Sequence, residues 1–218
     1  MQAAFRKKGN SQKDTAIVSA WLRRGEILAQ EQQCAQFDKD KFQASLTAIR
    51  SLTIIDESED FVPKLKSICA TAGVAVVLVP ALRGLGIYGA TRRLNDKYVM
   101  QLSLYGKSHD QLWFTIFHEI CHIIKHSRRE LYIEGKHLES EKAKEDEADA
   151  FAGDFLIPPK QLSHFLASVY KPTVQQIKRF ATSIGIAPGI VVGRLQHDRK
   201  LPMSCGNDLK VYYRWMDS

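Results

Sequence analysis

The stretch that decides the fold is QLWFTIFHEICHIIKH, residues 111–126. Apolar residues fill most positions of its helical wheel, which predicts a helix buried on nearly every side. Among its polar residues, His118 and His122 lie four residues apart and therefore project about 40° from one another around such a helix. Two imidazoles on one face can bind the same ion, and buried polar groups need a partner. The pattern predicts a metal-binding helix with Glu119 beside the ion, rather than two core histidines next to a surface glutamate.

A catalytic zinc site usually has a third protein ligand, and nearby residues limit where it can come from. The extended motif HExxHxxGxxH is excluded, because Lys125 and Arg128 stand where its glycine and last histidine would be. His126 lies two turns beyond His118, with Cα atoms about 12 Å apart, which is too far to bind the same ion. We expect His126 to lie behind the ligands rather than among them.

The acidic stretch EKAKEDEADAFAGDFLIP, residues 141–158, offers the third ligand. Glu145 and Asp149 share one helical stripe with two alanines, which would let this helix approach the first one closely. We expect Glu145 to bind the metal and Asp149 to accept the free N–H of a ligand histidine. Glu141 is a weaker ligand candidate, and Glu147 points to the opposite side, where we expect it to be solvated. The competing interpretation is an ordinary solvated face.

The chemistry follows from this ligand set. His118, His122 and Glu145 would hold Zn²⁺ with one position open for water, and Glu119 would take a proton from that water and pass it to the leaving amine. The predicted reaction is peptide-bond hydrolysis. An extended substrate can pair with the edge of a neighbouring sheet, and we expect that edge to be Lys97–Leu104. Three residues remain open as donors to the oxyanion: Tyr105, His126 and Tyr132.

The rest of the chain predicts an α+β fold, mostly helical, with a small antiparallel sheet of about three strands next to the metal helix. Helical periodicity covers residues 14–49, 61–72, 110–127, 139–156, 159–169, 173–184 and 188–197. Short runs rich in β-branched residues predict strands over 73–80, 86–94 and 97–104. We expect an N-terminal helical arm (1–60), a metal-binding core (61–170) and a C-terminal helical tail packed on it (171–218).

Composition limits the class of protein. The chain has 218 residues, of which 44% are hydrophobic and 25% charged, as in ordinary globular proteins. The longest apolar stretch, Gly73–Leu82, is about half the length of a membrane helix. The four cysteines show no paired spacing, which favours free thiols in a reducing cytoplasm. The net charge of +7 is concentrated in residues 1–30 and 171–218, which predicts either solvated faces or a docking surface for nucleic acid or an acidic partner.

HEICHIIKH followed by EDEADAFAGDFLIP resembles the ImmA/IrrE family of gluzincin-type metallopeptidases. That family shows HExxH, then E-x-x-A-[DN]-x-[FL]-A and a Leu-hydrophobic-Pro ending, and the match covers about residues 70–160. The resemblance implies a zincin-like fold and a zinc-dependent endopeptidase. It also implies a protein substrate that the enzyme cleaves or inactivates, such as a DNA-binding repressor in phage, mobile-element, toxin–antitoxin or stress-response control.

Two features depart from this family pattern. Longer members carry a helix-turn-helix head, whereas about twenty residues precede the AWLRRGE helix here, so we expect the head to be absent or supplied by another chain. Cys121 stands inside HEICH where a small residue is common. Its thiol would make the site sensitive to oxidation, but a packed small side chain is the favoured interpretation.

Two other functions compete with the peptidase. IKRFATSIGIAPGIVVGRL, residues 177–195, has the offsets of a helix-turn-helix and would make the protein a DNA-binding regulator. Pro188 and the apolar Ile190, Val191 and Val192 suit helical packing better than a recognition helix. The second alternative is an antitoxin-like or sensory module whose metal site supports binding without turnover.

Overall fold

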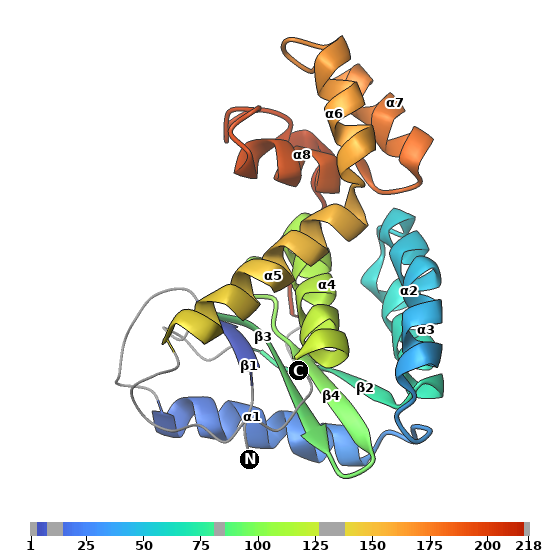
Figure 1. Cartoon of the computed structure of the whole chain (residues 1–218), viewed down its shortest axis with the longest axis vertical. Helices are drawn as coiled ribbons and strands as arrows, with labels where there is room; N and C mark the ends of the chain where they lie inside the picture. Colours follow the sequence, from blue (N-terminus) through green and yellow to red (C-terminus); the bar gives the residue numbers. More distant parts are fainter. Residues whose placement is uncertain (1–3, 8–14, 81–85, 127–137, 216–218) are drawn as a thin grey trace.

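The computed structural model describes residues 4–7, 15–80, 86–126 and 138–215. Helices dominate this part of the chain, as predicted for an α+β fold (Figure 1). The first elements are β1 (Ala4–Lys7), α1 (Thr15–Gln30), α2 (Lys39–Ser51), α3 (Ser58–Thr71) and β2 (Val74–Leu78). The later ones are β3 (Ile87–Leu94), β4 (Lys97–Leu102), α4 (His109–Lys125), α5 (Leu138–Leu156), α6 (Pro159–Ser168), α7 (Val174–Ile184) and α8 (Pro188–His197).

The sheet has four strands in the order β1-β3-β4-β2. β3 runs antiparallel to both β1 and β4, whereas β2 runs parallel to β4. The sheet is therefore mixed, and the prediction of a purely antiparallel sheet was wrong. The parallel neighbour agrees with the burial of β2 on both faces, which is typical of strands covered on two sides.

Two details of the sheet also differ from the sequence-based expectation. The region 1–60, predicted as a helical arm, contributes the strand β1 as well as helices. β4 lies between β3 and β2, so both of its edges are already hydrogen-bonded. The expected substrate edge, Lys97–Leu104, is therefore wrong, because β4 is an interior strand. The predicted boundaries at residues 60 and 170 stay a prediction.

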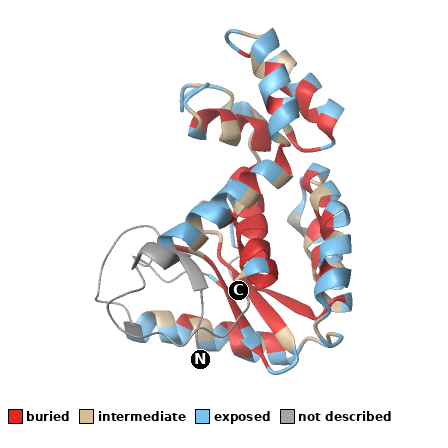
Figure 2. Cartoon of the chain, in the orientation of Figure 1, coloured by how far each residue is buried: buried red, intermediate tan, exposed pale blue. Residues whose placement is uncertain are grey.

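Helices cover both faces of the sheet. On one face, α1 places Trp21 against Ala75, Val77 and Val99, and the Trp21 indole donates a hydrogen bond to the Val79 carbonyl at 3.2 Å. On the other face lie α2, α3 and α4, whose apolar side chains join the opposite side of the same strands in one large core. Figure 2 shows α4 buried along nearly its whole length, as its sequence predicts.

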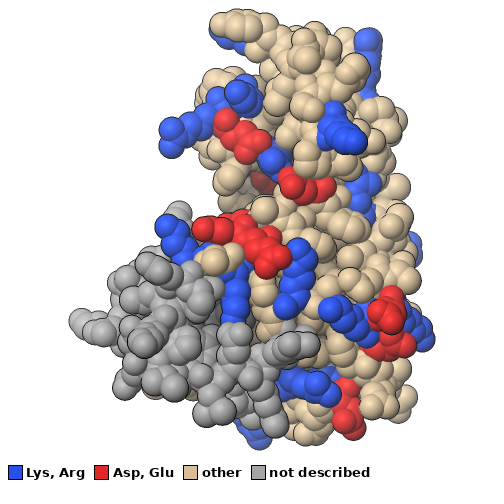
Figure 3. Space-filling model, viewed as in Figure 1, with Lys and Arg blue, Asp and Glu red and all other residues tan. Residues whose placement is uncertain are grey.

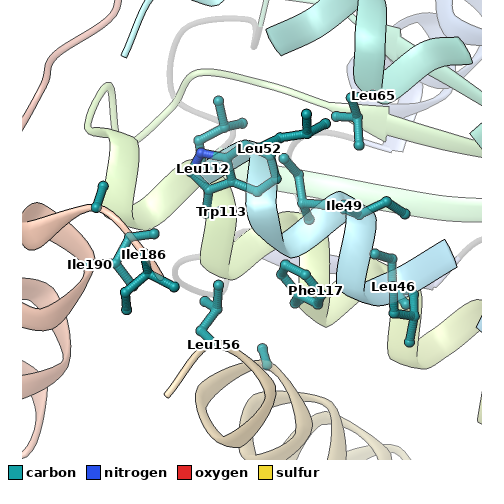
Figure 4. Packing of buried hydrophobic residues seen from close by; sticks show 14 of the residues in the cluster. Leu46, Ile49, Leu52, Leu65, Leu112, Trp113, Phe117, Leu156, Ile186 and Ile190 are labelled. Carbon is teal, nitrogen blue, oxygen red and sulfur yellow. The ribbon is translucent and has the colours of Figure 1, made fainter. Parts of the chain in front are cut away.

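The C-terminal helices pack against α4 near its N-terminal end. α5 continues into α6 after Leu156-Ile157-Pro158, and α8 contacts α4. Figure 4 shows Ile186 and Ile190 near Trp113 and Phe117 of α4. Ile190, Val191 and Val192 are all buried, which confirms that this segment packs into the core.

The chain returns to the start of α4 after α8. Lys210 forms an ion pair with Asp110 at 2.8 Å, and both side chains are only 9% exposed. The backbone N–H of Tyr213 donates to the Lys107 carbonyl at 2.7 Å. These contacts tie the C-terminal segment to the helix that carries the candidate site. None of the described helices combines the length and apolarity that a membrane crossing requires.

Candidate metal centre

The three polar residues of HEICH lie on one buried face of α4. His118 and His122 are 1% and 4% exposed, and Glu119 is completely buried. The apolar side chains around them fix the rotation of α4, because they occupy the remaining faces of the helix in the core. The imidazoles are therefore held toward α5 with little freedom to move into water.

α5 approaches α4 closely enough to bring the predicted third ligand to both histidines. Ala148 and Ala152 are fully buried in this helix contact, as expected for small residues that let two backbones approach. The Glu145 carboxylate lies 3.2 Å from His118 Nε2 and 3.3 Å from His122 Nε2. The two Nε2 atoms are 3.0 Å apart. One ligand atom from each of these three side chains lies within 4.8 Å of the others, so the triad can hold a metal ion.

Further hydrogen bonds set the tautomer of each histidine. His118 Nδ1 lies 2.8 Å from Asp149 Oδ1, so in the neutral imidazole this nitrogen carries the proton and Nε2 has the lone pair that a metal ion would bind. His122 Nδ1 lies 3.0 Å from His126 Nδ1, and His126 Nε2 lies 2.9 Å from the carboxylate of Glu147. In this series of hydrogen bonds, His126 Nε2 donates to Glu147 and His126 Nδ1 accepts from His122. Both ligand Nε2 lone pairs therefore point toward the Glu145 carboxylate.

The ionisation of the ligands shows which charge the site favours. Burial lowers the pKa of His118, but the hydrogen bonds to Asp149 and Glu145 outweigh it and raise the pKa to about 9. Burial raises the pKa of Glu145, but the two histidines outweigh it and lower the pKa to about 2. The first shift shows that the surrounding carboxylates favour a positive charge at His118, and the second shows that the histidines keep Glu145 negatively charged. A divalent cation placed there would supply the positive charge in place of this proton and would bind the two Nε2 atoms and an oxygen of Glu145.

Glu119 lies beside this triad and is not one of its ligands. The Thr91 hydroxyl donates to Glu119 Oε2 at 2.6 Å, which fixes the carboxylate against β3. Glu119 Oε1 is buried and has no hydrogen-bond partner among the described residues. Burial raises the pKa of this carboxyl, although the charges of both histidines oppose the shift. A buried oxygen without a partner, next to two nitrogen donors and one oxygen donor, fits a hydrated divalent metal ion.

Sequence reasoning missed two residues of β3 and the contacts of one residue of α5. Thr91 and Gly89 lie against Glu119, but nothing in the local sequence links them to α4. Glu147 is exposed to solvent, as expected, and it also pairs with Lys125 at 2.7 Å and with His126 at 2.9 Å. Its carboxylate remains exposed, so it reaches the back of the site from the surface.

Of the remaining candidates, the structure places Tyr105 and Cys121. Tyr105 packs edge-on against Tyr88, and Tyr132 lies outside the described residues, as does the side chain of Glu141. Cys121 is fully buried, and burial raises the pKa of its thiol to about 11, which agrees with a packed side chain. Figure 3 shows acidic side chains on this side of the molecule, gathered beside a hollow between α5 and the α6–α8 helices.

Comparison with known proteins gives one family match. A model of peptidase family M78, described as the IrrE N-terminal-like domain, matches residues 75–195, which is more than half of the chain. The matched range runs from β2 to α8 and contains the triad, Glu119 and the residues that contact them. No curated protein matches the chain.

Proposed function

The chain belongs to the ImmA/IrrE family of metallopeptidases, and on this premise we propose that it is a zinc-dependent endopeptidase. The observation that carries the proposal is the convergence of His118, His122 and Glu145 beside the unpartnered oxygen of Glu119. A purely structural metal site has four protein ligands, whereas this one has three and a base. The site thus has the composition of a hydrolytic centre.

The roles of the side chains follow from their contacts. A bound Zn²⁺ would acidify a water molecule and polarise the carbonyl of the scissile peptide bond. Glu119 accepts the proton of this water at Oε1, because Oε2 is held by Thr91. The raised pKa makes Glu119 a stronger base than an exposed glutamate, and it then delivers the proton to the nitrogen of the leaving amine. Asp149 and His126 orient the two ligand histidines.

We further propose that the substrate is a regulatory protein, such as a DNA-binding repressor, and that the enzyme acts by cleaving or inactivating it. This part rests on the resemblance of the HEICH and EDEADAFAGDFLIP segments to a family engaged in such control. Direct DNA recognition by this chain has less support, because the candidate recognition helix α8 buries Ile190, Val191 and Val192.

The test separates a peptidase from a metal-bearing module that binds without turnover. Glu119→Gln keeps the shape of the side chain but removes the base, so the variant should capture the substrate and leave it intact. The captured protein is then incubated with the zinc-loaded wild-type chain, and mass spectrometry searches for a new N-terminus. We expect a single cleavage that stops on addition of a chelator. If the wild type and Glu119→Gln leave the captured protein equally intact, the wild-type chain does not cleave it and the peptidase proposal fails.

A further inference from the structure

One edge of β3 lies directly beside the candidate base. A Cβ atom built on Gly89 would stand 2.7 Å from Glu119 Oε1, and Thr91 binds the other oxygen of the same carboxylate. A peptide that reaches Glu119 in an extended conformation would therefore run along β3. The opposite edge of β3 is already paired with β4, so a peptide that pairs with β3 has one edge left to use.

The chain's own segment Ala4–Lys7 occupies this edge. In the antiparallel ladder, Ala4 faces Thr91 and Arg6 faces Gly89, which are the two β3 residues against Glu119. β1 also contacts α4, so it lies on the side of β3 where the metal helix runs. Figure 1 shows β1 alongside β3, with β4 on the other side. The segment thus has the position and extended shape expected of a bound substrate.

We propose that Ala4–Lys7 is an intramolecular blocker, which an extended substrate must displace from β3 before it can be cleaved. This inference rests on the proposed peptidase function. The ladder is short, and its register shifts between Arg6 and Lys7. A substrate segment that pairs over more residues can therefore replace it. The enzyme would then select protein segments that are already extended or locally unfolded, and it would leave folded domains intact.

The geometry of the ladder supplies a matched pair of variants. Neighbouring residues of an antiparallel strand alternate, one directing its N–H to the partner strand and the next directing it outward. Of Phe5→Pro and Arg6→Pro, one therefore removes a bond to β3 and the other removes an outward N–H that an edge strand can spare. Both substitutions are made in the full chain carrying Glu119→Gln, so that no peptide is hydrolysed. Thermal unfolding checks that each variant keeps its fold.

The probe is a fluorescein-labelled peptide of residues 1–10, and its binding is measured by fluorescence anisotropy. The tethered segment competes at an effective concentration in the millimolar range, so releasing it should tighten probe binding by about tenfold or more. We expect this gain in one proline variant, while the other stays near the affinity of the parent chain. Equal affinities in all three chains, or weaker binding in both proline variants, would overturn the proposal.

A measurement on the unsubstituted chain tests the same point. Hydrogen exchange should find that the paired amides of Ala4–Lys7 exchange at least about tenfold faster than those between β3 and β4, because a displaceable strand opens without the rest of the sheet. Equally slow exchange would make β1 a fixed part of the sheet and overturn the proposal.

Cleavage of unfolded casein by the zinc-loaded chains with Glu119 intact separates this inference from the function on which it rests. Faster cleavage in the variant that binds the probe more tightly supports both. If the probe results hold and no chain cleaves casein or the captured substrate, the peptidase function fails while the competition for β3 stands. If all chains cleave casein at one rate and bind the probe equally, the blocker fails and the peptidase stands.

Discussion

Replacing Asp149 with alanine tests how the site holds its first histidine. The Asp149 carboxylate lies 2.8 Å from His118 Nδ1, on the side of the ring opposite the nitrogen that faces Glu145. Removing such a partner typically weakens metal binding by about 10- to 100-fold. The Asp149 side chain is 51% exposed, so solvent screens its charge. The main effect of the substitution is therefore that the orientation of the His118 ring is no longer fixed. We therefore expect a loss near the lower limit, about tenfold or 1.4 kcal/mol of binding free energy.

The assay is a competition between the protein and a chromogenic chelator for zinc, which needs no substrate. Asp146→Ala is the matched control, because it removes the same charge from an exposed position of the same helix. We expect this control to bind zinc within about twofold of the wild type, since an exposed charge without a ligand contact contributes little. If Asp149→Ala and Asp146→Ala bind zinc equally tightly, the contact with His118 does not position the ligand.

Three other changes probe separate parts of the molecule. Gly89→Ala pushes a methyl group against the Glu119 carboxylate and should slow cleavage about 100-fold without altering zinc affinity. The control Gly153→Ala meets only the flexible guanidinium of Arg194 and should preserve both the cleavage rate and the zinc affinity. Equal cleavage rates in the two variants would contradict the close approach of β3 to Glu119. Lys210→Met strands the buried carboxylate of its partner, so urea denaturation should find a loss of about 3 kcal/mol in unfolding free energy, and no loss would mean that the ion pair is dispensable. Exposed Cys205 should react with a maleimide in the native protein. Cys69 is buried, and burial raises the pKa of its thiol to about 12, so it should react only after unfolding. Peptide mapping that finds Cys69 labelled in the native protein would contradict this.

The triad was accessible from sequence because helical periodicity converts spacing into direction. The spacing places His118 and His122 on one face of their helix, and it places Glu145 and Asp149 on one face of the next helix together with two alanines. The same reasoning excluded His126 as the third ligand and left Glu141 as a weaker candidate than Glu145. What it required was only that two helices pack against each other, and the buried alanines allow this.

The partners that come from the sheet were not accessible in this way. Thr91 contacts Glu119 across a separation of 28 residues, and alternation along a strand does not say which strand lies next to it or in which direction. For the same reason, the parallel pairing of β2 with β4 escaped prediction. Glu147 was placed correctly on the far side of the helix stripe, but its contacts with Lys125 and His126 depend on where α4 ends.

The central claim is that His118, His122 and Glu145 form a metal site and that Glu119 is not part of it. The most direct test is the zinc content per chain of the wild type, Glu145→Gln and Glu119→Gln, measured by inductively coupled plasma mass spectrometry after zinc loading and buffer exchange. We expect about one zinc ion per chain in the wild type and in Glu119→Gln, and loss of most of it in Glu145→Gln. A wild type without zinc, or a Glu145→Gln variant that keeps as much zinc as the wild type, would contradict the account.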